Sequence, residues 1–183
     1  MLTMTTPRQA TGFTLIELMI GIAILAIALA LGIPGFVEWV QNTQIRTAGE
    51  SISAGLQTAR NEAIRRNTPI EFTLTGNGGA GETGWQIVVR NTGILLQAQA
   101  AGEGSRNATL VTTPADARTV TFTGLGRASG TNADATPVLT QINIDNATMN
   151  ATTSRDLQIG ITSGGAIRMC DPNMTITTDP RSC

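Results

Sequence analysis

The chain has 183 residues, enough for one membrane-anchored helix and one globular domain. Its formal net charge of −1 excludes a protein that coats nucleic acid by general basicity, although all twelve basic residues are arginine and leave room for a local phosphate-binding patch. Because the chain has no histidine, no nucleophile–base–orienter set can be assembled, and we expect no enzyme, no metal site and no cofactor.

The first twelve residues are predicted to be a leader. Met1 to Gly12 carry one charge, Arg8, and no apolar run. A secretory signal peptide has its own apolar core before the cleavage site, whereas here the apolar core follows Gly12 and would stay in the mature chain. We expect Arg8 to keep the leader in the cytoplasm and to send the C-terminal domain into the periplasm.

Residues 13–37 are predicted to cross a membrane as a helix. No charged side chain occurs from Leu18 to Val37, and a run of this length spans a bilayer. Glu17 directly precedes the run, and a lone carboxylate at mid-membrane costs about 2.5–3.5 kcal/mol. Cleavage after Gly12 would create a cationic amine at Phe13, in the same chain or in a neighbour, that pairs this carboxylate.

The string from Gly12 to Leu18 resembles the class III signal of type IV prepilins and type II secretion pseudopilins. The resemblance implies cleavage between Gly12 and Phe13 by a prepilin peptidase, and N-methylation of Phe13 by the same enzyme. It also implies that Glu17 guides subunit docking by meeting the Phe13 amine of a neighbouring subunit. An ordinary signal anchor with an incidental glutamate is the alternative interpretation.

Two features mark the end of the apolar segment. Pro34, flanked by Gly32 and Gly35, is expected to kink or locally melt the helix. Trp39 follows where an aromatic residue of the membrane interface is expected.

Residues 38–67 continue the same helix with an amphipathic pattern. Apolar residues recur at intervals of three and four, which predicts a stripe packed on a sheet. Asn67-Thr68-Pro69 is expected to end the helix. The members of the stripe are Ile45, Ala48, Ile52, Leu56, Ala59 and Ala63.

Residues 68–183 are predicted to form a β-rich globular domain, because the hydrophobic period changes to two after Pro69. A long N-terminal helix against antiparallel sheet is an α+β architecture, and the resemblance implies the pilin fold. The expected strands are 70–74, 85–90, 94–97, 108–112, 119–123, 138–144, 157–161 and 166–169.

Residues 76–81 have the G-x-G-x-x-G spacing of a dinucleotide-binding loop. Such a site needs a helix that begins at the loop, and here the strand-like segment 85–90 follows. We therefore interpret the glycines as a hairpin loop.

Three local features resemble the GspH/FimT group of minor pilins and pseudopilins. They are Ala59–Ala63, the turn Phe122–Arg127, and the terminal segment Gly164–Pro172 with its last residue Cys183. The resemblance implies a minor type IV pilin that primes or caps pilus assembly, held in the inner membrane until it joins other major and minor pilins in a filament. A DNA-binding minor pilin for natural transformation and a GspH-like pseudopilin of type II secretion are the alternatives.

The two cysteines, Cys170 and Cys183, lie at the C-terminal end. If this part of the chain is periplasmic, a disulfide between them would stabilise the fold by about 3 kcal/mol in the chain-entropy model. Two free thiols or half of a metal site are the alternatives, and the metal reading is weak without histidine.

Arg168 is a candidate contact to double-stranded DNA. In FimT-type proteins implicated in DNA uptake, a C-terminal glycine-arginine-x-arginine element supplies cations to the DNA backbone. Aligned on Cys170, this chain has Gly165-Ala166-Ile167-Arg168, which retains the second arginine only. The missing phosphate contact would weaken binding and lower the salt slope by about one unit.

Other arginines are candidates to compensate, namely Arg127, Arg155 and Arg181. Three aspartates are equally close in the sequence and oppose them, namely Asp156, Asp171 and Asp179. The alternative role of Arg168 is structural, in which it orders the C-terminal loop by pairing with Asp171 or Asp179.

Overall fold

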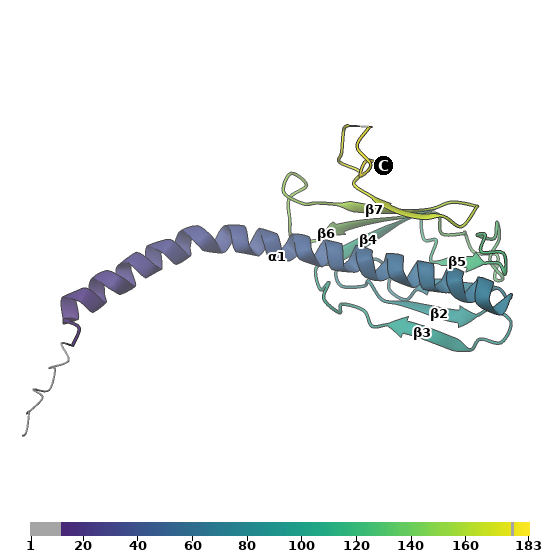
Figure 1. Cartoon of the computed structure of the whole chain (residues 1–183), viewed down its shortest axis with the longest axis horizontal. Coiled ribbons are helices and arrows are strands. Elements are labelled where there is room, and N and C mark those ends of the chain that lie inside the picture. The colour runs from purple at the N-terminus through teal and green to yellow at the C-terminus, as the bar shows by residue number, and fades with distance from the viewer. Residues whose placement is uncertain (1–11, 177) are drawn as a thin grey trace, which may run out of the picture. The chain divides into compact units, whose positions relative to one another are not determined.

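The computed structural model describes residues 12–176 and 178–183, and the predicted leader residues 1–11, with Arg8, lie outside this range. The described chain forms two compact units, which divide between Val37 and Glu38, and one long helix that belongs to both (Figure 1). The elements are α1 (Leu15–Arg66), β1 (Ile70–Leu74), β2 (Trp85–Val89), β3 (Leu95–Gln99), β4 (Ala108–Thr113), β5 (Thr119–Phe122), β6 (Gln141–Asn146), β7 (Leu157–Ile161) and β8 (Ile167–Cys170).

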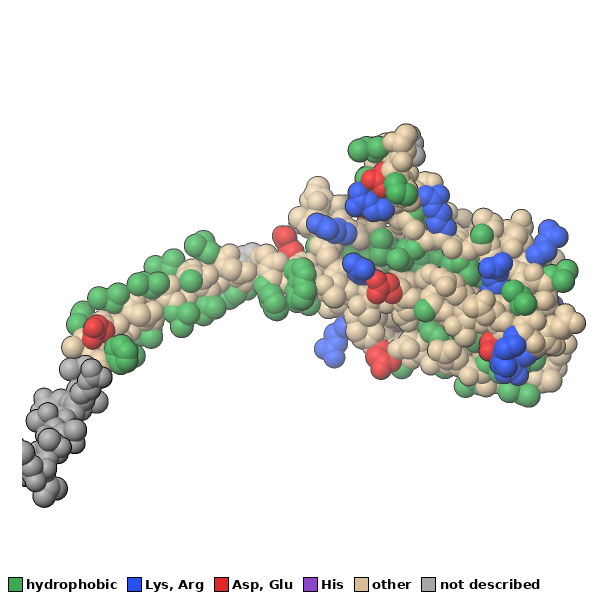
Figure 2. All heavy atoms as spheres, viewed as in Figure 1, with side chains coloured by type: hydrophobic (Ala, Val, Ile, Leu, Met, Phe, Trp, Pro, Cys, Tyr) green, Lys and Arg blue, Asp and Glu red, His purple; other side chains and the backbone are tan. Residues whose placement is uncertain are grey.

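The first unit contains the apolar part of α1. Its large hydrophobic side chains are exposed. Figure 2 shows hydrophobic side chains along the visible face of this segment. By length and composition this helix could cross a membrane. We expected Pro34 to kink or locally melt the helix; the helix continues through position 34, so it does not melt there. A proline removes only one helical hydrogen bond, and the adjacent turns keep theirs.

The second unit is the α+β domain that the sequence predicts. Its strands form two four-stranded antiparallel sheets, with the orders β3-β2-β1-β5 and β4-β6-β7-β8. The predicted stripe of α1 is buried throughout, from Ile45 to Ala63, in one core with residues of both sheets. The predicted glycine-rich loop joins β1 and β2, which pair as an antiparallel hairpin.

Two glycines of α1 let the helix approach both sheets. A Cβ atom at Gly49 would lie 3.1–3.4 Å from side-chain ends of β6, β7 and β8. A Cβ atom at Gly55 would lie 2.9 Å from the rings of Phe72 in β1 and Trp85 in β2. Trp85 also donates from Nε1 to Ser51 Oγ of α1 at 3.0 Å, which fixes the helix on this sheet.

The first polar residues of the second unit attach α1 to loops of the domain. Gln41 Oε1 accepts hydrogen bonds from Asn107 Nδ2 at 3.0 Å and from Asn146 Nδ2 at 2.9 Å. Asn42 Oδ1 accepts from the Arg155 amide at 2.9 Å. The helix is therefore held to the domain by polar contacts before its apolar stripe begins at Ile45.

The observed β6 starts later than predicted. Val138 forms only an isolated parallel bridge with Thr119, and the Leu139 amide donates to the Thr119 carbonyl at 2.9 Å. The Thr140 amide donates to the Thr113 carbonyl, also at 2.9 Å. Apolar alternation predicts a strand at 138–140, but the backbone there bonds to two different strands and joins the ladder only at Gln141.

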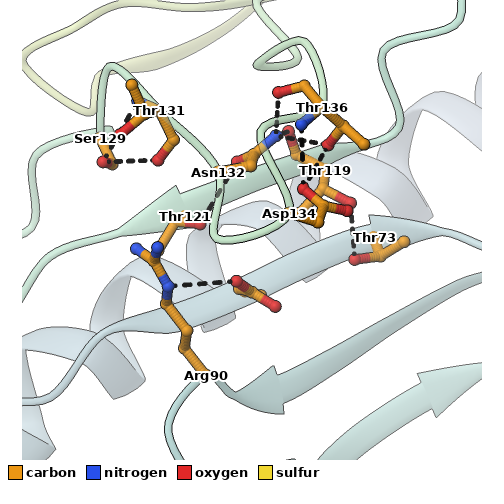
Figure 3. A network of polar contacts seen from close by, with 10 residues as sticks. Thr73, Arg90, Thr119, Thr121, Ser129, Thr131, Asn132, Asp134 and Thr136 are labelled. Atoms are coloured by element: carbon orange, nitrogen blue, oxygen red, sulfur yellow. Dashed lines mark hydrogen bonds and ion pairs between the residues drawn. The ribbon is translucent and has the colours of Figure 1, made fainter.

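A polar network covers part of the sheet that contains β1 and β5 (Figure 3). Buried Asn132 donates from Nδ2 to the carbonyls of Thr119 and Pro137 at 3.0 and 3.1 Å, and its Oδ1 accepts from Thr121 Oγ1 at 3.4 Å. On the same face Thr73 and Thr119 join their hydroxyls at 3.0 Å. These bonds hold the loop that follows β5 on the sheet and satisfy polar atoms that it buries.

Candidate assembly and binding sites

The predicted docking residue Glu17 lies in the first turn of α1. The Thr14 amide and the Thr14 hydroxyl both donate to Glu17 Oε2 at 2.9 Å, and the Glu17 amide donates to Thr14 Oγ1 at 3.3 Å. This reciprocal arrangement is a capping box, which satisfies amides that have no partner within the helix. Glu17 is thus already a structural part of the helix start.

The predicted cleavage and methylation residue, Phe13, precedes this cap and is 92% exposed. The cap uses Glu17 Oε2, so Oε1 is the oxygen that the cap leaves for a cation. The role of Thr14 was not predicted from the sequence, although the threonine-x-x-glutamate spacing at positions 14–17 is the signal that identifies a capping box.

The two cysteines join in a disulfide, Cys170–Cys183, with a Cα–Cα distance of 5.1 Å. The bond places the C-terminal residues beside the end of β8. There the Asp171 amide donates to the Arg181 carbonyl at 2.7 Å, and Asp171 forms a parallel bridge with Ser182. The disulfide therefore closes a loop whose two ends are also joined by backbone contacts.

The Arg168 side chain forms hydrogen bonds with this loop. Its Nη2 donates to the carbonyl oxygens of Pro180 at 3.1 Å and Ser182 at 2.7 Å. Among the described residues no ion pair joins Arg168 to Asp171 or Asp179, so the predicted carboxylate partners are wrong. The disulfide brings backbone carbonyls alongside β8, and these take the place of a carboxylate.

The second candidate arginine, Arg181, pairs within its own turn. Its Nη2 lies 2.9 Å from Asp179 Oδ2, and its Nε donates to Asp179 Oδ1 at 3.1 Å. The hydrogen bonds from Arg181 lower the pKa of Asp179 to about 2. The carboxylate of Asp179 therefore stays charged at neutral pH. It neutralises the positive charge of Arg181, which a DNA phosphate would need for binding.

The turn that carries Arg127 meets the terminal glycines. Gly165 has a φ of +80°, and a Cβ atom there would lie 1.9 Å from the Gly126 carbonyl oxygen. The same oxygen accepts from Arg60 Nε of α1 at 3.0 Å. The structure thus brings together the three segments that resemble the GspH/FimT group, and only glycine fits at position 165.

Arg155 lies in the sequence between Ser154 and Asp156. Ser154 Oγ is 2.9 Å from Asp145 Oδ1 and 2.5 Å from Asp156 Oδ1, so the two carboxylates share its one hydroxyl hydrogen. Burial is the main cause that raises the pKa of Asp156. Within residues 12–176 and 178–183, no group of three or more potential side-chain ligands could hold a metal ion.

Residues 48–165 match the model of a protein family described as type II transport protein GspH. The chain belongs to the GspH family. The resemblance to the GspH/FimT group is confirmed, and this family consists of structural pilins and pseudopilins rather than enzymes. Residues 7–33 match a second model, the prokaryotic N-terminal methylation motif, which implies processing by prepilin peptidase and partners among pilins or pseudopilins.

Relatives in sequence include a fimbrial protein and a type II secretion system protein. A fimbrial protein of Pseudomonas aeruginosa is 40% identical over 68 residues, which are 37% of this chain and 44% of the relative. A type II secretion system protein H of Xanthomonas campestris is 33% identical over 67 residues, which are 37% of this chain and 40% of the relative. The matches therefore span less than half of the length of these relatives.

The fold is that of solved pilins. The crystal structure of the type IV minor pilin FimU of Pseudomonas aeruginosa is similar, with a TM-score of 0.54 at 18% identity, covering 72% of this chain and 91% of that one. The solution structure of Escherichia coli GspH gives a TM-score of 0.46 at 16% identity, covering 75% of this chain and 94% of that one. The α+β pilin fold that the sequence predicts is confirmed.

Proposed function

We propose that the chain is a minor type IV pilin that primes or caps pilus assembly and is anchored in the inner membrane until it joins the filament. The observation that carries this proposal is the apolar part of α1, whose large side chains are exposed in the isolated chain. Such a surface needs hydrocarbon or other apolar helices around it. A bilayer covers it before assembly, and the helices of neighbouring pilins cover it afterwards.

In this proposal the leader is cleaved between Gly12 and Phe13, and Phe13 becomes the methylated N-terminus. The new amine of Phe13 pairs with Glu17 of a neighbouring subunit, using the oxygen that the Thr14 cap leaves. Packing of the apolar surface supplies most of the contact, because charge pairs in lipid add little specificity by themselves.

Type IV pilus membership is supported over type II secretion by the relatives. The solved structure with the TM-score of 0.54 is a type IV minor pilin, and the fimbrial relative is the more identical of the two sequences. Deletion of the gene tests this assignment. We expect fewer surface pili, restored by re-expression, and unchanged export of type II secretion substrates; normal piliation with impaired export would contradict it.

DNA binding through Arg168, Arg127 and Arg181 is the weaker proposal. Arg168 donates to two carbonyls of its own loop, and Arg181 is paired with Asp179. Of these three arginines, only Arg127, which is exposed, has no side-chain hydrogen bond or ion pair within the described chain.

We therefore expect titration of the full chain with double-stranded DNA at two salt concentrations to show weak binding with a small salt slope. Binding that is strongly salt-dependent, and that Arg168→Ala weakens, would favour a DNA receptor instead.

A further inference from the structure

A pocket of about 510 Å³ lies in the second unit, beside the turns of α1 that follow the apolar segment. Trp39 and Val40 supply apolar lining, and Gln44 supplies an amide. Arg106 faces the same pocket from the loop between β3 and β4. The lining therefore combines an aromatic ring, an aliphatic side chain and a cation.

Two side chains that line this pocket have hydrogen-bond donors without an acceptor in the described chain. Gln44 Oε1 accepts from the Asn107 amide at 2.9 Å, which holds the side-chain amide in place and leaves Nε2 without a partner among the described residues. Arg106 is exposed, and its guanidinium likewise has no hydrogen bond or ion pair within the described chain. Glu103 of the same loop does not line the pocket, and its carboxylate accepts a hydrogen bond from Gln99.

The pocket begins close to the end of the apolar segment. Trp39 lies two residues after Val37, which is about 3 Å along a helix axis. Its side chain is 63% exposed. Tryptophan at this position of a membrane-spanning helix lies at the level of the lipid headgroups. In an anchored chain Trp39, which lines the pocket, therefore lies at the level of the lipid headgroups.

We propose that this pocket binds the headgroup phosphate of an anionic phospholipid while the chain is anchored in the membrane. The inference rests on the membrane anchoring in the proposed function. The Arg106 guanidinium and Gln44 Nε2 donate to phosphate oxygens, and Trp39 and Val40 contact the glycerol and upper acyl carbons. No carboxylate lines the pocket, so the cation of a zwitterionic headgroup finds no partner there.

Fluorescence quenching of Trp39 tests this proposal. The full chain is placed in nanodiscs of equal amounts of phosphatidylglycerol and phosphatidylcholine, and only one of the two lipids carries brominated acyl chains. Exchanging the label leaves the charge of the bilayer unchanged. Trp85 is 2% exposed and contributes a constant background, which Trp39→Phe measures.

We expect stronger quenching by brominated phosphatidylglycerol, corresponding to about a fivefold local enrichment of that lipid. Arg106→Gln should abolish the difference. Arg155→Gln is the matched control, because Arg155 is exposed, its amide bonds to Asn42 of α1, and it does not line the pocket. This variant should retain the difference.

Equal quenching by both labels, or an excess that persists in Arg106→Gln, would overturn the headgroup site while the anchoring stands. Shielding of Trp39 by an added partner pilin, without any lipid preference, would overturn it in favour of a subunit contact. Failure of the chain to enter nanodiscs would contradict the membrane anchoring itself and the pocket proposal with it.

Discussion

Glu17 caps its own helix, and in the proposed function the same carboxylate also has a docking role. In the isolated chain it caps α1 through Thr14. In the proposed filament it also accepts the Phe13 amine of a neighbour. The cap keeps the carboxylate in a fixed place before docking, so little side-chain entropy is lost when the subunits meet. The docking role of Glu17 stays a prediction from the resemblance to prepilins, whereas the cap is a local structure that the spacing of Thr14 and Glu17 could have indicated.

The lowered pKa of Asp179 predicts that the C-terminal loop loses stability in acid. Hydrogen bonds from Arg181 lower the pKa of Asp179 in the folded chain to about 2, below the unfolded value of about 3.9. A depressed pKa contributes stability above the unfolded value, and this contribution is lost as the pH falls from about 4 to about 2.

The melting temperature of the full chain in detergent, measured from pH 2 to 6, checks this. Wild type should exceed Asp179→Asn at pH 6, and the two should converge near pH 2. The difference should shrink in high salt, because the Arg181 side chain is exposed and that of Asp179 remains partly exposed. Parallel profiles at every pH would contradict the assignment.

The disulfide has a predicted effect at the scale of the β8 element. Replacing both Cys170 and Cys183 by serine opens the loop between them, whose ends are 13 residues apart in the sequence. The chain-entropy model then predicts a loss of about 3 kcal/mol in the free energy of unfolding. Urea unfolding of the full chain, with intact mass before and after reduction, measures it. A variant whose midpoint equals that of the oxidised wild type would contradict the prediction.

The packing of α1 is tested by two glycines of the same helix. Gly55→Ala places a Cβ atom 2.9 Å from the rigid rings of Phe72 and Trp85, and overpacking of this kind costs about 1–3 kcal/mol. Gly49→Ala is the matched control, since its neighbours at 3.1–3.4 Å are flexible side-chain ends that can move. Chemical unfolding should rank Gly55→Ala as clearly less stable; equal stability would contradict the observed helix–sheet contact.

Local pattern predicted most elements but not their pairing. The stripe from Ile45 to Ala63 and the alternation at Ile70–Leu74 each depend on neighbours in sequence, and both are found. The division into two sheets depends on ladders between distant segments, which one sequence does not encode locally. The same holds for Arg168, whose carbonyl partners become available only after the disulfide has folded the chain end back.

At the scale of the whole molecule, the two family models match different parts of the chain. The GspH match covers residues 48–165, which are most of the domain, and the methylation motif covers residues 7–33, which include the start of α1. The domain is a packed unit with its own core, whereas the large side chains of the apolar part of α1 are exposed in the isolated chain. In the proposed function, assembly into a filament covers this surface, so incorporation into pili is the property to measure.

Incorporation of Glu17→Val into pili tests this most directly. The variant removes the carboxylate that we propose accepts the Phe13 amine, and it places an apolar side chain at the start of the apolar helix. Pili sheared from cells that express wild type, Glu17→Val or the control Glu38→Gln are probed for the protein, with membrane levels measured in parallel. We expect Glu17→Val to remain in the membrane and to be strongly depleted from pili, and Glu38→Gln to match wild type. Normal abundance of Glu17→Val in pili would contradict the docking role of Glu17.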